Sequence, residues 1–122
     1  MAARNPQTPY IFGIEAEWLA AVYLRAKGYR ILATRFRAAG GEIDLVAKRW
    51  NTLVFVEVKA RRTMDSARTS ISADKHRRVA QAARAFLARF PALPETIRYD
   101  AVFLCPNQWP KHEQAIAELD LN

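Results

Sequence analysis

The chain has 122 residues, of which 51% are hydrophobic, and its formal net charge at pH 7 is +7. This length suits one domain with a single core, residues 1–122, and is too short for two ordinary domains. Its apolar runs are too short for a membrane helix, and residues 1–9 lack the apolar stretch of a signal peptide, so we expect a cytoplasmic protein without a membrane partner.

The first half of the chain predicts one helix followed by three strands. Apolar side chains recur at helical spacing from Ile14 to Lys27, and Gly28 stands where a glycine commonly ends a helix. Residues 29–37 carry apolar side chains among alternating basic ones, which predicts a strand. Residues 42–47 and 53–59 are rich in β-branched residues, and the short spacer between them predicts a hairpin.

The second half predicts a loop, a long helix and a buried strand. Residues 63–71 are polar and aperiodic, as in a loop. Ser72 is a suitable N-cap for a helix that reaches Arg89 or Phe90 before Pro91. Residues 97–105 read as a buried strand, in which Cys105 is expected to be a small buried hydrophobe.

The end segments have weaker patterns, and the order of the elements defines the fold class. Residues 110–120 predict a weak amphipathic helix or a tail, and we expect residues 1–10 and 107–122 to be loosely ordered or peripheral. The order is helix, three strands, helix, strand. A helix that crosses between the last two strands favours their parallel pairing, so the sequence predicts an α/β fold with a mixed central sheet flanked by helices.

The register of the hairpin brings charged residues together. A turn centred on Trp50 and Asn51 places Asp44 opposite Glu57 and Glu42 opposite Lys59. One face of the hairpin is then wholly apolar and must meet a helix; it is formed by Ile43, Leu45, Ala47, Val54, Val56 and Val58. The charged residues share one corner of the opposite face.

Two opposed carboxylates destabilise a sheet by a few tenths to about 1 kcal/mol unless a positive charge lies between them. Asp44 and Glu57 therefore suggest a site for Mg²⁺, with Mn²⁺ as a substitute, because Mg²⁺ is commonly held by one or two carboxylates, water and substrate phosphate. Lys59 can orient or deprotonate a water, or neutralise charge on the phosphate. An ordinary charge pattern on a solvated sheet face explains the spacing about equally well. The apolar character of both strands argues against that alternative.

These residues resemble a known family. The segments Gly41-Glu-Ile-Asp-Leu-Val46 and Val54-Phe-Val-Glu-Val-Lys-Ala-Arg61 are similar to the signature of the YraN family, uncharacterised bacterial proteins with an expected nuclease function. The resemblance implies the restriction-endonuclease-like fold of the PD-(D/E)xK superfamily, with Asp44, Glu57 and Lys59 as its metal-binding and catalytic residues.

The resemblance also implies a role for Glu17. The segment Glu17-Trp-Leu-Ala-Ala-Val-Tyr-Leu24 resembles the family's N-terminal pattern, and related Holliday junction resolvases place such a glutamate beside the metal. Glu17 also shares a helix face with Ala20 and Leu24, which we expect to face the sheet. A surface glutamate is the alternative. Arg35 stands where the family often has Asn.

The excess of basic residues between Arg25 and Arg89 fits a nucleic-acid partner, although a solvated surface explains it nearly as well. The candidate nucleic-acid-binding residues are Lys75, Arg37, Arg61, Arg62 and Arg78. Our leading hypothesis is a metal-dependent endonuclease that acts on DNA, including branched DNA. The alternative is a non-catalytic nucleic-acid-binding protein with the same fold. Many junction-cutting enzymes are dimers, so a homodimer is a further expectation.

Overall fold

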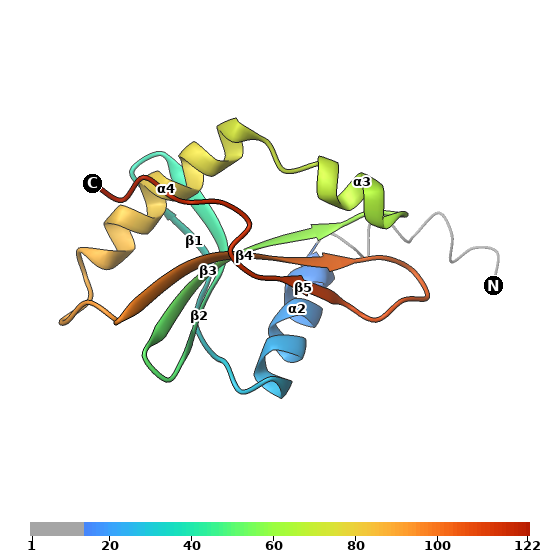
Figure 1. Ribbon diagram of the computed structural model, residues 1–122, viewed down its shortest axis with the longest axis horizontal. Coiled ribbons are helices and arrows are strands. Elements are labelled where there is room, and N and C mark those ends of the chain that lie inside the picture. Colours follow the sequence, from blue (N-terminus) through green and yellow to red (C-terminus); the bar gives the residue numbers. More distant parts are fainter. Residues whose placement is uncertain (1–13) are drawn as a thin grey trace.

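The computed structural model describes residues 14–122, in which five strands form one mixed sheet with helices on both faces (Figure 1). The elements in chain order are α2 (Ile14–Ala26), β1 (Arg30–Ala38), β2 (Gly41–Arg49), β3 (Thr52–Ala60), α3 (Met64–Thr69), α4 (Ala73–Leu87), β4 (Thr96–Leu104) and β5 (Lys111–Glu113). The strand order is β1-β2-β3-β4-β5, and only β3 and β4 pair in parallel. This α/β arrangement confirms the predicted fold class and is consistent with a restriction-endonuclease-like fold. Among residues 14–122, no helix is long and apolar enough to cross a membrane.

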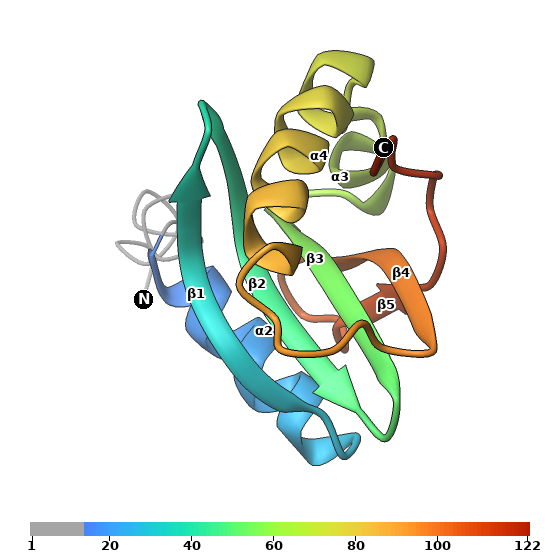
Figure 2. The ribbon, with the colours of Figure 1, turned by 90° about the vertical axis from the view of Figure 1, so that its left-hand side faces the viewer.

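Each face of the sheet carries its own hydrophobic core. Ala20 and Leu24 of α2 pack on one face, against a group that includes Leu45, Val56 and Val102. On the other face, the apolar side of α4 covers a second group that includes Val46, Phe55, Val79, Ala82 and Ala83. Figure 2 shows α2 and α4 on opposite sides of the strands. Because both faces are covered, β2 and β3 are apolar along most of their length.

The β2–β3 hairpin has the predicted turn and register. Arg49 pairs with Thr52 across Trp50 and Asn51, and the pairing continues in the same register to Leu45 and Val56. The regular ladder ends there. Beyond this pair, the backbone N–H of Val58 donates to Asp44 Oδ2 at 2.8 Å and not to a backbone carbonyl of β2.

The placement of Ile43 on the apolar face shared by Leu45 and Val58 is wrong. Ile43 packs in the core beneath α4, together with Val46. Strict alternation is therefore interrupted beside Asp44. On the neighbouring strand, Arg35 has a left-handed backbone with φ of 51° close to this point, and such conformations are typical of distorted strands.

Two other predictions need correction. Residues 63–71 do not form a simple loop, because they contain α3, which Thr63 caps by accepting the N–H of Ser66 and which buries Ala67. Of the two alternatives predicted for residues 110–120, a helix or a tail, the helix is wrong, since residues 111–113 form the edge strand β5 and residues 114–122 contain no helix. Beyond it, the N–H of Ile116 donates to the carbonyl of Tyr99 at 2.8 Å.

The other elements match their predictions. Ser72 caps α4 through a hydrogen bond from the N–H of Lys75, and β4 runs parallel to β3. Cys105 is buried, as expected for a small apolar residue. Gly41 allows α4 to lie very close to β2, because a Cβ atom there would overlap the carbonyl oxygen of Arg78 and lie 2.9 Å from the nitrogen of Ala82.

Candidate metal and catalytic site

Two buried carboxylates lie on neighbouring strands where the β2–β3 ladder ends. Asp44 of β2 is 7% exposed and Glu57 of β3 is 1% exposed. One carboxylate oxygen of Asp44, Oδ2, is fixed by the N–H of Val58. Both side chains therefore come from rigid strands inside the sheet, and both are shielded from bulk water.

Two lysines approach the same oxygen of Glu57. The Nζ atom of Lys59 lies 3.5 Å from Glu57 Oε2, and the Nζ atom of Lys75 lies 3.7 Å from it. Lys59 comes from β3, two residues beyond Glu57, whereas Lys75 comes from the first turn of α4. The structure thus brings Lys59 and Lys75 together at Glu57, and the charge of Asp44 acts on the same carboxyl.

The other oxygen of Glu57 has no hydrogen-bond partner. Within residues 14–122, Oε1 is a buried side-chain atom without a donor. The pKa of the Glu57 carboxyl is raised to about 7, chiefly by burial and also by the charge of Asp44, while Lys75 and Lys59 act in the opposite direction. The two lysines therefore do not fully offset the cost of burying this charge.

The donor atoms fit a hard divalent cation held by few protein ligands. Among residues 14–122, no group of three or more His, Cys, Asp or Glu side chains is placed to hold a metal ion. A dedicated protein cage is therefore not formed by the described residues. Two carboxylates that leave room for water and phosphate are the usual protein contribution to a Mg²⁺ site, and Asp44 and Glu57 can supply them.

Glu17 is not grouped with these two carboxylates as a third ligand. Its Oε1 atom accepts a hydrogen bond from Arg35 Nε at 2.8 Å, and its side chain is 20% exposed. That hydrogen bond raises the pKa of the Arg35 guanidinium, to which the charges of Glu42 and Asp44 also contribute. Arg35 thus connects Glu17 electrostatically to the edge of the carboxylate site. In the sequence, Arg35 differs from the family pattern but is not among the predicted site residues.

Of the predicted nucleic-acid-binding residues, one contacts the site and the other four are exposed arginines. Lys75 belongs to it directly through Glu57. Arg37 is 68% exposed and lies 3.7 Å from Glu42. Arg61 and Arg62 are exposed just beyond the end of β3, and Arg78 is exposed on α4. The structure therefore leaves these four arginines accessible to a polyanion.

Tyr99 is buried and His76 is half-buried, and neither is among the predicted site residues. The Tyr99 hydroxyl and His76 Nε2 lack hydrogen-bond partners within the described residues, and their rings meet edge to face at 5.3 Å. Burial raises the pKa of Tyr99, and the nearby charges of Glu57 and Asp44 raise it further. Only the packing of α4 on β4 brings these residues together, so no local sequence signal could have identified them.

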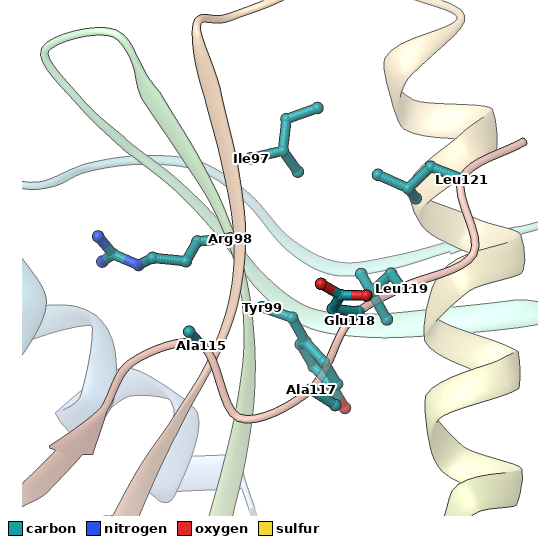
Figure 3. A pocket seen from close by; sticks show the side chains of 8 residues that line it. All are labelled: Ile97, Arg98, Tyr99, Ala115, Ala117, Glu118, Leu119 and Leu121. Carbon is teal, nitrogen blue, oxygen red and sulfur yellow. The ribbon is translucent and has the colours of Figure 1, made fainter.

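A cavity that neither carboxylate lines is present elsewhere on the sheet. It has a volume of about 320 Å³ and lies between β4 and the C-terminal segment (Figure 3). Its lining includes Ile97, Tyr99, Leu119 and Leu121, but neither Asp44 nor Glu57. Figure 3 shows Arg98 and Tyr99 pointing to opposite sides of β4. This cavity is therefore separate from the candidate metal site.

Comparison with known proteins identifies similar chains without a stated activity. The model of the uncharacterised protein family UPF0102 matches residues 16–104. A UPF0102 protein of Methylorubrum extorquens is 58% identical over 101 residues, which cover 82% of this chain and 79% of the relative. A UPF0102 protein of Methylobacterium nodulans is 50% identical over 120 residues, which cover 98% of this chain and 93% of the relative.

Proposed function

We propose a function from the site itself, because this chain belongs to the uncharacterised protein family UPF0102, whose description states no activity. UPF0102 and YraN are the same family, so the resemblance of the sequence motifs is confirmed. The function that the site supports best is metal-dependent hydrolysis of phosphodiester bonds in DNA.

The observation that carries this proposal is the incompletely neutralised Asp44–Glu57 pair. Glu57 is almost fully buried, its Oε1 lacks a hydrogen-bond partner, and its pKa is raised to about 7. A buried charge kept in this condition is unfavourable for stability alone. Strongly shifted pKa values that arise from burial and a specific charged neighbour are typical of functional sites.

Glu57 and Asp44 would hold the cation, with Mg²⁺ favoured and Mn²⁺ able to use the same oxygen ligands. When bound, the cation would polarise a phosphate oxygen and lower the pKa of a bound water. Because its pKa is raised to about 7, Glu57 would release a proton on binding the cation. Asp44 keeps its orientation through the N–H of Val58 while its other oxygen stays available.

The lysines supply positive charge where the reaction develops negative charge. Lys59 is held at Glu57, so its ammonium group would orient the attacking water or neutralise charge on the phosphate. Lys75 is well placed to bind a neighbouring phosphate oxygen as a point charge. Glu17 would become a third oxygen ligand only after Arg35 releases its carboxylate. Until then, Glu17 acts by holding Arg35 beside the site.

Cleavage assays on four proteins test the proposal: the wild type, Glu57→Gln, Asp44→Asn and Glu95→Gln. Glu95 is an exposed residue before β4 and serves as the matched control. Linear duplex, single-stranded and four-way-junction DNA are incubated with Mg²⁺, Mn²⁺ or EDTA. We expect metal-dependent cutting by the wild type and Glu95→Gln, with a loss of at least about 100-fold in the other two variants.

The alternative function makes a different prediction for the same samples. If the wild type and Glu57→Gln bind DNA equally well and neither cuts any substrate with either metal, the hydrolytic proposal is wrong. The chain would then be a non-catalytic nucleic-acid-binding protein that retains the nuclease fold.

A further inference from the structure

The connection between β4 and β5 projects from the end of the sheet that carries the catalytic lysine. Lys59 pairs with Phe103, and Phe103 pairs with Lys111, so these three residues form one row across the sheet. Residues 105–110 continue beyond this row. Figure 1 shows this connection at the opposite end of the sheet from the β2–β3 turn.

This connection presents an aromatic side chain to solvent. The side chain of Trp109 is 88% exposed. Pro106 and Pro110 flank the exposed residues and restrict the backbone at both ends of the segment. Lys111, which follows directly, is also exposed. The indole ring is therefore displayed on a stiff segment beside a positive charge.

The base of the connection is fixed to its neighbours. The backbone N–H of Arg61 donates to the carbonyl of Leu104 at 3.1 Å, which ties the end of β3 to the end of β4. Arg68 of α3 donates from Nη2 and Nε to Glu113 Oε2, at 2.6 and 2.9 Å, and also lies over the Phe103 ring. Both strands that lead into the connection are thus held in place.

The distance from Trp109 to the site suits a nucleic-acid strand. Lys111 is two strands from Lys59, or about 10 Å, and Trp109 precedes Lys111 by two residues, just outside β5. A separation of about 10 Å corresponds to about three stacked nucleotides. The exposed Arg61 and Arg62 lie at the same end of the sheet and can contact the intervening phosphates.

We propose that Trp109 is a stacking platform for an unpaired base, and that the protein acts on strands with unpaired nucleotides close to the cleaved phosphate. Aromatic stacking beside a basic surface is the usual way in which proteins bind single strands without sequence preference. This inference rests on the proposed function for the position of the cleaved bond. It adds the substrate class, namely single-stranded, gapped or branched nucleic acid rather than continuous duplex.

The chain offers a matched control at the other end of the sheet. Trp50 is 85% exposed in the β2–β3 turn and also has basic neighbours. However, the Arg49 guanidinium already lies over the Trp50 ring, 5.2 Å from its centroid. An effect of general hydrophobicity or charge would appear in both tryptophan variants, whereas an effect of position would appear only at Trp109.

Equilibrium binding in EDTA tests this inference without any cleavage. Fluorescence anisotropy is measured for the wild type, Trp109→Ala, Trp109→Phe and Trp50→Ala with labelled oligothymidine, oligouridine and a blunt DNA duplex. For the unpaired strands, we expect Trp109→Ala to weaken binding between about 5-fold and about 150-fold. We expect Trp109→Phe to retain most of the affinity, and Trp50→Ala to match the wild type.

Blunt-duplex binding should change less than two-fold in all four proteins. The two oligonucleotides show whether the stacked strand is DNA, RNA or either. The inference is overturned if Trp109→Ala binds unpaired strands as tightly as the wild type, if both tryptophan variants lose affinity equally, or if the wild type binds no single strand. Because no metal is present, these outcomes are independent of the cleavage assay.

Discussion

Replacing Glu57 by Gln removes a buried charge while keeping the shape of the side chain. The folded protein holds the proton of Glu57 up to about pH 7, whereas the unfolded chain releases it near the ordinary value of 4.5. This difference between the pKa of Glu57 in the folded protein and in the unfolded chain corresponds to about 3 kcal/mol of unfolding free energy. The wild type therefore loses about 3 kcal/mol relative to Glu57→Gln as the pH rises from below 4.5 to above 7. This loss is a large fraction of the 5–15 kcal/mol typical of a domain.

Urea unfolding of both proteins between pH 4 and 8.5, in EDTA, measures this difference. Titrating groups that lie away from Glu57 contribute equally to both proteins and cancel when one curve is subtracted from the other. The lost contacts with Lys59 and Lys75 change the difference in unfolding free energy by a constant amount. The evidence is therefore the change of that difference with pH. We expect the unfolding free energies of the two proteins to diverge by about 3 kcal/mol over this pH range, which corresponds to about 10 °C in melting temperature. Glu95→Gln serves as the control and should follow the wild type.

A flat difference curve between pH 5 and 8 would refute the reasoning. That result would mean that Glu57 is ionised in the fold at the same pH as in the unfolded chain. Adding Mg²⁺ provides a second comparison, because a ligand that binds only the folded state raises its stability. The wild type should gain stability above pH 7, whereas Glu57→Gln should not.

Three further predictions follow from the same geometry. Mg²⁺ affinity should rise up to about tenfold per pH unit below pH 7 and level off above about pH 8, because Glu57 must lose its proton. Calorimetry in two buffers of different ionisation enthalpy detects the released proton. An affinity that does not depend on pH would contradict this prediction. Gly41→Ala should destabilise the fold by about 1–3 kcal/mol in urea unfolding, because α4 must move away from β2. Asp100→Ala should lower the free energy of unfolding by about 3–5 kcal/mol, since it leaves buried donors unpaired. Amide hydrogen exchange should then increase first in β5. Unchanged exchange in β5 would show that Asp100 does not anchor this strand.

The hairpin and the long helix were predictable because their signals are local. Alternation and a two-residue turn fix the register of β2 and β3, and Ser72 marks the start of α4. The same register predicted that Asp44 and Glu57 come from adjacent strand positions. Its failure at Ile43 has a structural cause, since the Asp44 side chain takes the place of a backbone acceptor at the end of the ladder.

The remaining features depend on contacts between distant segments. The helix α3 is too short to show a helical period, and its buried Ala67 packs against β4 residues far along the chain. The strand β5 has three residues, and its pairing with β4 defines it. Similarly, the contact of Lys75 with Glu57 requires α4 to lie over the sheet, and the contact of Glu17 with Arg35 requires α2 to lie beside β1. No spacing rule within one segment could supply these distances.

A second buried carboxylate provides a comparison for Glu57. Asp100 of β4 is fully buried one strand away, and it accepts hydrogen bonds from Arg98, His112 and the N–H of Ala115. Burial acts to raise the pKa of Asp100, but the hydrogen bonds from His112 and Arg98 outweigh it and leave the pKa below its usual value.

The two carboxylates therefore occupy similar depths with opposite electrostatic outcomes. The protein satisfies Asp100 with its own donors, as expected for a group that fastens the C-terminal segment to the sheet. It leaves Glu57 with an unpartnered oxygen and a raised pKa, although Lys59 and Lys75 are within reach. Since this chain can satisfy a buried carboxylate fully, the incomplete neutralisation of Glu57 is the reason why we propose a cation at this position.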